Sequence, residues 1–189
     1  MFGRRKRSEA LEWLSGKPWH CAGCGVVHDE MFALACTAPD AWQGPVEYAP
    51  NGAIEPGGDF LSEDFCMLRG EHFFIRCSVE IPVHGLAGKF SFGVWSTLSR
   101  ANFAKYLDGF DNGDYPDFGP WFGWFSNDLR LFGTTLNQKC QVHPQRERHR
   151  PVLSMIDSGH PLAIAQAEGV SPEQAMGFYA YYGCTPVTR

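Results

Sequence analysis

The stretch FFIRCSVEI (residues 73–81), followed by FSFGVW (residues 90–95), decides the fold of this 189-residue chain. In both segments apolar side chains occupy every second position, which is the period of a strand with one buried face. The link from His84 to Gly88 has the length of a hairpin connection. We therefore expect two antiparallel strands at the centre of a sheet.

Helices and further strands are predicted on both sides of this hairpin. A short helix is expected over Ser8–Leu14 with Ser8 as its cap, and another begins after Ser99. Weaker strand patterns cover residues 136–142 and 151–157, and two helices follow, the last with a capping box that starts at Ser171. Strands followed by terminal helices predict an α+β fold, with an antiparallel sheet and helices packed on one face.

Length and charge limit the organisation of the chain. The formal charge is -5, but four of the 16 basic residues lie within residues 1–7, which leaves 12 basic against 21 acidic residues and a charge of -9. We expect residues 1–7 to be a disordered basic tail and residues 8–189 to form a single domain. An acidic body makes nucleic acid an unfavourable partner, since phosphates would be repelled.

The sequence predicts a cytoplasmic location. No apolar run approaches the length of a membrane helix, and the basic N-terminus is not followed by the apolar stretch of a secretory signal. Seven cysteines form no disulfide framework, so they are expected to be thiols or metal ligands in a reducing compartment.

The most distinctive motif is a Cys-x-x-Cys pair, Cys21 and Cys24, in a knuckle that covers about residues 18–30. Two thiolates at this spacing form half of a tetrahedral zinc site, and the intervening glycines allow the backbone amides to face sulfur. His28 is the expected third ligand, with His20 as a competitor. Cys36 or Cys66 could provide the fourth.

Other interpretations of this knuckle are open. The hairpin could have lost its metal and survive as a packing element. A redox Cys-x-x-Cys is disfavoured, because the pair is not placed between a strand and the N-terminus of a helix that would stabilise a thiolate.

A second motif, Asp157 with His160, could form an acid/base pair, since the carboxylate can orient a ring that titrates near neutrality. The simpler interpretation is the start of a helix, with Asp157 or Ser158 as cap and Pro161 in the first turn.

Aromatic side chains gather at Trp121 and Trp124. If exposed they would form a binding platform, although burial in the core is the default for large rings.

Several short segments, taken in order, resemble an uncharacterised bacterial family, domain of unknown function 2199. They include Cys21 to Gly25 with His28, Phe73 to Arg76, Gly93 to Ser99, Phe122 to Trp124 and His160 to Ala163. The resemblance implies one bacterial, cytoplasmic domain and brings no established activity. It draws attention to Arg76, which projects from the strand face opposite Ile75 and could bind an anion or serve the structure.

Two functions compete. The first is a protein-binding module, immunity-like or accessory to a toxin or effector, with a structural zinc knuckle. It is favoured by the acidic body, the aromatic content and the absence of a catalytic signature. The alternative is a zinc-dependent enzyme that uses Cys21, Cys24 and His28 as ligands, with His160 and Asp157 as acid and base.

Overall fold

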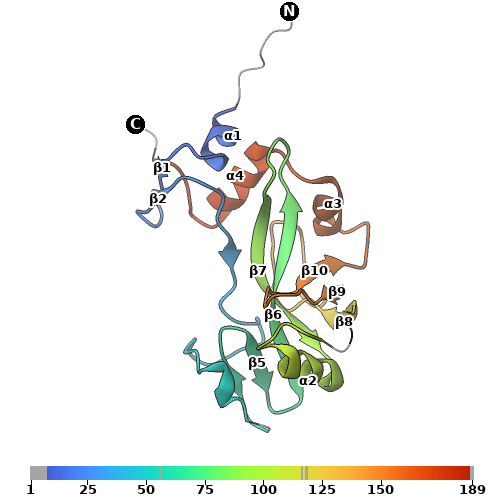
Figure 1. Ribbon diagram of the computed structural model, residues 1–189. Helices are drawn as coiled ribbons and strands as arrows, with labels where there is room; N and C mark the ends of the chain where they lie inside the picture. Colours follow the sequence, from blue (N-terminus) through green and yellow to red (C-terminus); the bar gives the residue numbers. More distant parts are fainter. Residues whose placement is uncertain (1–7, 56, 116, 118, 188–189) are drawn as a thin grey trace, which may run out of the picture.

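The two central strands form as the alternation predicts. In the computed structural model, which describes residues 8–55, 57–115, 117 and 119–187, they are β6 (His72–Pro82) and β7 (Lys89–Leu98). They pair antiparallel from Phe73 opposite Leu98 to Pro82 opposite Lys89. The hairpin is the long central feature of the ribbon (Figure 1).

The remaining strands extend this hairpin into a mixed sheet in the order β3-β7-β6-β10-β9-β8, with β5 also paired to β6. Most pairings are antiparallel, while β10 runs parallel to β6 and β3 parallel to β7. The bounds of the other sheet strands are β3 (Leu34–Ala35), β4 (Phe60–Leu61), β5 (Phe65–Leu68), β8 (Trp121–Trp124), β9 (Lys139–His143) and β10 (Val152–Met155).

The sheet curls so that its last strand returns to β7. Directly after β8, Phe125 forms an antiparallel bridge with Ser96, and the Ser126 amide donates to the Trp95 carbonyl at 2.9 Å. The curl gives the sheet a closed inner side, which holds the main core.

In the described part of the chain, four α-helices accompany the sheet: α1 (Glu9–Leu14), α2 (Arg100–Gly109), α3 (Pro161–Glu168) and α4 (Pro172–Tyr181), with a 3-10 turn at Asn51–Ala53. The predicted caps Ser8, Ser99 and Ser171 all accept hydrogen bonds from the first turn of their helices, and the capping box of α4 is present. The α+β class is confirmed.

All four helices bury side chains in one main cluster with the inner sheet face, which includes Ile75, Cys77 and Val79 of β6. A smaller cluster lies on the other face, around Phe74 and Trp95. The buried helix residues therefore belong to one side of the sheet, as predicted.

A small two-stranded sheet, β1 (Trp19–His20) and β2 (Val27–His28), lies beside α1 and α4 at one end of the molecule (Figure 1). The predicted tail, residues 1–7, lies outside the described residues. None of the described helices has the length and apolar character needed to cross a membrane.

Candidate metal centre

The Cys-x-x-Cys motif forms the turn between β1 and β2. The Cys21 amide donates to the Val26 carbonyl at 2.9 Å, and the Gly25 amide donates to the Cys21 carbonyl at 3.0 Å. Gly25 has a φ of 71°, in the left-handed region that glycine adopts most easily. These bonds fold the turn tightly and point both thiols to one side.

Within the described residues, Cys21, Cys24 and His28 offer three donor atoms that all lie within 4.8 Å of one another. The Cys24 Sγ lies 3.4 Å from the His28 Nε2. Ordinary zinc bond lengths in a tetrahedron separate sulfur and nitrogen donors by about 3.6 Å. The three side chains are therefore spaced as ligands of one metal ion.

The His28 ring is held by aromatic neighbours. It stacks on Phe32 at a centroid distance of 4.0 Å and lies 4.8 Å from the Trp19 ring. Phe32 in turn stacks on Tyr179 of α4 at 4.3 Å, and the Tyr179 hydroxyl donates to the Phe32 carbonyl at 2.7 Å. Helix α4 thus fixes the position of the third donor.

The C-terminal segment docks on the same turn. The Ala22 amide donates to the Thr185 carbonyl at 2.7 Å, and the Val187 amide donates to the His20 carbonyl at 2.9 Å. A β-carbon on Gly23 would overlap the Gly183 carbonyl oxygen, so only glycine permits this close approach. The two ends of the domain are joined here by backbone hydrogen bonds.

This docking places a third thiol, Cys184, next to the pair, although Cys184 does not belong to the group of donors that all lie within 4.8 Å of one another. Burial raises the pKa of Cys184, and side-chain hydrogen bonds with Cys21 and Cys24 raise it further. Burial also acts to raise the pKa of Cys21, but the Cys24 and Gly23 amides and the thiols of Cys24 and Cys184 outweigh it, so that this pKa is lowered. A stabilised thiolate is the form that binds metal.

The other predicted ligands lie elsewhere. His20 does not belong to the group of three donors. Cys66 is fully buried in the smaller cluster around Trp95, and Cys36 packs against both this cluster and the main core. Burial raises the pKa of Cys66 to about 12 and that of Cys36 to about 11, as expected for inert structural thiols.

Sequence reasoning missed Cys184 because it lies at the opposite end of the chain from the motif. The only signal was indirect: of the seven cysteines, Cys77, Cys140 and Cys184 were left without an assigned role. Its approach to the hairpin depends on the path of the chain after α4.

The predicted pair of Asp157 and His160 is not brought together as an acid and base. One Asp157 carboxylate oxygen accepts the Gly159 amide at 3.0 Å. The prediction of Asp157 or Ser158 as the helix cap is wrong, because His160 itself caps α3, with its Nδ1 accepting the Leu162 amide at 3.1 Å. Its Nε2 faces the Thr134 carbonyl at 3.2 Å, which requires a proton on Nε2.

Helix α3 also lies far from the hairpin β1-β2, on the opposite side of the central strands (Figure 1). The residues of the enzyme hypothesis therefore fall in two separate regions.

The predicted aromatic platform is divided between the two faces of β8. Trp121 is buried in the main core. Trp124 is 41% exposed and meets the ring of Phe122, 48% exposed, edge-on at 5.2 Å. Arg76 is buried above the Trp95 ring at 5.9 Å.

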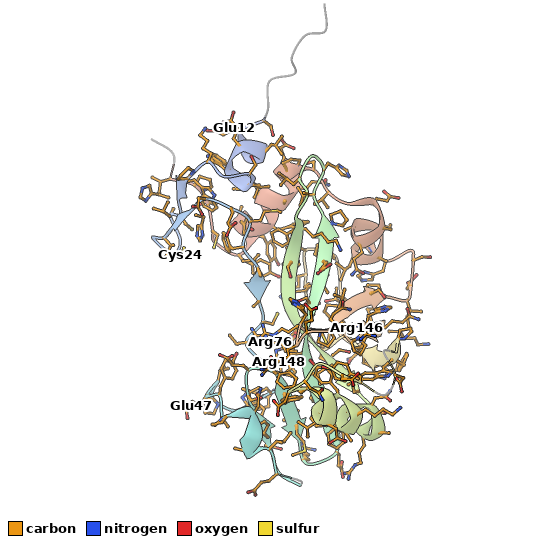
Figure 2. The ribbon with its side chains drawn as sticks, viewed as in Figure 1. Glu12, Cys24, Glu47, Arg76, Arg146 and Arg148 are labelled. Atoms are coloured by element: carbon orange, nitrogen blue, oxygen red, sulfur yellow. The ribbon has the colours of Figure 1, made fainter. Side chains whose placement is uncertain are left out.

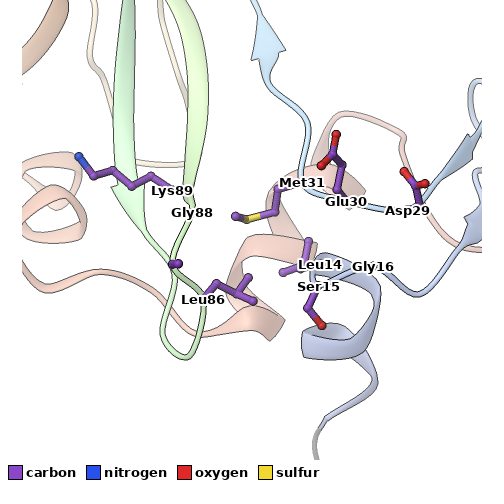
Figure 3. Close-up of a pocket in the computed structure, with 10 residues that line it drawn as sticks. Leu14, Ser15, Gly16, Asp29, Glu30, Met31, Leu86, Gly88 and Lys89 are labelled. Atoms are coloured by element: carbon purple, nitrogen blue, oxygen red, sulfur yellow. The ribbon is translucent and has the colours of Figure 1, made fainter.

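A hollow of about 640 Å³ lies between the N-terminal segments at residues 14–16 and 29–31 and the turn that joins β6 to β7 (Figure 3). Met31 extends across it toward Gly88, where a β-carbon would lie 3.1 Å from the Met31 methyl group. Lys89 at its edge is already paired with Glu80 at 2.6 Å. Apolar contacts such as that of Met31 hold the N-terminal region on the sheet independently of any metal.

Comparison with protein families gives one match. The profile of a family described as an uncharacterized protein conserved in bacteria, DUF2199, covers residues 20–170. The chain belongs to this family. No curated protein and no solved structure matches it. The matched range contains Cys21, Cys24 and His28 of the metal centre, whereas Cys184 lies beyond it.

Proposed function

We propose that this member of the DUF2199 family is a protein-binding module, of an immunity-like or accessory kind, whose ends are joined by a structural zinc ion. The observation that carries the proposal is the cluster of Cys21, Cys24 and His28, together with the docking on this turn of the C-terminal segment that carries Cys184, through the hydrogen bond from the Ala22 amide to the Thr185 carbonyl. With Cys184 as the fourth ligand, three thiolates and one imidazole would complete a tetrahedral zinc site, as in structural Cys₃His centres. With all four positions filled by protein, no position remains for a substrate.

The chemistry of the donors favours zinc over harder cations. Thiolates and imidazole select zinc, whereas calcium and magnesium require oxygen ligands. Bound zinc would fix the C-terminal segment after α4 to the hairpin and would add to the free energy of folding. A reducing compartment such as the cytoplasm would keep the thiols available.

Protein binding is supported by the exposed pair Phe122 and Trp124 on β8. Aromatic rings that remain at the surface provide large, rigid contact areas, and such residues dominate the energy of many interfaces. The negative charge of the chain favours rapid capture of a basic partner.

Metal analysis and X-ray absorption spectroscopy of the purified protein test the zinc centre. We expect close to one zinc per chain, with three sulfur ligands and one nitrogen ligand. A content well below one half, or a first shell containing a water oxygen in place of one sulfur, would contradict a closed structural site.

Binding is tested by affinity capture from the native host, with Phe122→Ser/Trp124→Ser compared with Tyr181→Ser. Tyr181 is a suitable control because it is also exposed, at 54%, but lies on α4. We expect a stoichiometric partner that the double variant loses and the control retains, with zinc content unchanged in both. If no partner is captured, or if both variants retain it equally, β8 is not the interface.

A further inference from the structure

Strand β3 forms one border of the sheet and is paired on one side only. It pairs with β7, and no strand of the described residues pairs with its other side. In Figure 2 it is the pale blue arrow between the hairpin that carries Cys24 and the loop that carries Glu47. An unpaired strand edge can pair with an extended segment of another chain.

The backbone of Ala35 points away from the sheet. The Cys36 amide donates to the Gly93 carbonyl of β7 at 2.8 Å. Successive residues of a strand direct their amides and carbonyls to alternate sides, so those of Ala35 face outward. Two residues further along, the edge is closed, because the Thr37 carbonyl accepts the Tyr48 hydroxyl at 2.7 Å. The open part of the edge is therefore short and centred on Ala35.

Small side chains leave this edge uncovered. Ala33 and Ala35 are both exposed. Proteins commonly protect such an edge with lysine or proline, and residues 33–37 contain neither. A second backbone could therefore approach to the usual strand spacing of about 4.8 Å.

An apolar pocket of about 150 Å³ lies beside the edge. It is lined by six uncharged residues: Leu34, Ala35, Cys36, Phe92, Leu129 and Tyr182. Tyr182 follows α4 and is 42% exposed, so this wall of the pocket reaches the surface. An apolar cavity of about 150 Å³ holds a molecule the size of benzene. The pocket therefore fits the side chain of a phenylalanine or leucine.

The chain around β3 is acidic. Residues 29–40 contain three carboxylates, Asp29, Glu30 and Asp40, and no lysine or arginine. All three are exposed, and none forms an ion pair with a described residue. Burial, and then the charge of Asp40, raise the pKa of the Cys36 thiol to about 11, so Asp40 lies close to the pocket wall. Basic side chains beside an apolar anchor would complement this surface.

We propose that the β3 edge binds an extended peptide of a partner protein. The peptide pairs with the backbone of Ala35, places a phenylalanine or leucine side chain in the pocket beside Tyr182 and carries basic residues toward Asp40. The inference goes beyond the proposed function: Phe122 and Trp124 of β8 do not line this pocket, and the site requires no zinc.

Titration with synthetic peptides, followed in proton-nitrogen correlation spectra of the full chain, tests the site. The probes are acetyl-Arg-Thr-Phe-Thr-Arg-amide and the same peptide with leucine in place of phenylalanine. We expect the Ala35 amide signal to shift saturably with at least one of them. A matched probe with serine as the anchor should bind roughly ten- to hundredfold more weakly, because the burial of a large apolar side chain is lost. A probe with glutamate in place of both arginines should also bind more weakly, and most clearly at low salt.

Variants of two neighbouring tyrosines test the pocket. Tyr182→Ser removes one wall, and Tyr181→Ser is the matched control, since Tyr181 is 54% exposed but does not line the pocket. We expect the first to weaken binding of the better probe and the second to leave it unchanged. Phe122→Ser/Trp124→Ser should bind the probe normally, so a failure at the β3 edge and a failure at β8 are separate results.

The proposal is overturned if neither probe shifts the Ala35 amide signal, or if the serine probe binds as tightly as the others. It is also overturned if sedimentation shows a dimer whose Ala35 amide is protected from hydrogen exchange without peptide, because a second copy then occupies the edge. The wild-type titration is decisive alone, so a variant that fails to fold does not leave the question open.

Discussion

Replacement of Cys184 with serine removes the fourth donor of the proposed zinc centre while keeping a side chain of similar size. Loss of even an outer-shell partner commonly weakens metal binding by about 10- to 100-fold. We therefore expect zinc affinity to fall at least about 100-fold in Cys184→Ser, because a direct ligand is lost.

This loss has a predictable effect on stability. At a zinc concentration about 1,000 times the dissociation constant, binding stabilises the folded state by about 4 kcal/mol. For a chain of this length, 1 kcal/mol corresponds to about 2–4 °C, so removal of zinc from the wild type should lower Tm by roughly 8–16 °C. A 100-fold weaker site loses about 2.7 kcal/mol of this, or roughly 5–11 °C.

Thermal unfolding followed by circular dichroism, with and without a zinc chelator, measures both effects. Cys36→Ser is the matched control, since Cys36 was a predicted ligand that the structure places against the two core clusters and outside the group of Cys21, Cys24 and His28. It should keep one zinc and the chelator response of the wild type. In chelator, Cys184→Ser and the wild type should unfold at nearly the same temperature. Equal zinc affinity in Cys184→Ser and the wild type would refute the role of Cys184. So would a Tm difference between these two proteins that is as large with the chelator as without it.

Three further changes test the fold around these sites. Gly23→Ala should lower both stability and zinc affinity, because its β-carbon would overlap the Gly183 carbonyl; unchanged zinc titration would argue against the observed docking. Gly177→Ala is the opposite case: this glycine lies inside α4, and an added β-carbon would meet no atom of another element within 4 Å. The substitution should therefore raise the free energy of unfolding by about 0.5–1 kcal/mol, measured in urea. His160→Ala should cost about 1 kcal/mol by loss of the cap of α3, whereas His160→Asn should restore most of it; equal losses would show that capping is not its role.

Local patterns were sufficient for most of the secondary structure. The alternation in residues 73–81 predicted β6, and Ser99 and Ser171 marked the starts of α2 and α4. These features depend on neighbours a few residues apart, so the sequence carries them directly. The cap of α3 was predicted wrongly because an Asp and a Ser are more usual caps than the histidine that acts there.

The parallel pairings were not predictable in this way. Strand β10 joins β6 in parallel, and β3 joins β7, after long connections whose paths leave no periodic signal. The exposure of Trp124 and burial of Trp121 likewise required the position of β8 in the sheet, since alternation alone does not identify the inner face.

By itself the sequence determined a Cys-x-x-Cys turn with His28 close behind it, because these donors are joined by a few residues of chain. Only the tertiary structure decided which other thiol approaches them: the path of the chain after α4 carries Cys184 to the hairpin, whereas Cys66 lies in the smaller cluster around Trp95 and Cys36 packs against both core clusters. The same holds for Arg76, whose charge was evident but whose burial above Trp95 could be seen only once the surrounding strands were in place. Side chains distant in sequence meet through packing of the whole domain, and that packing is not encoded in any single segment.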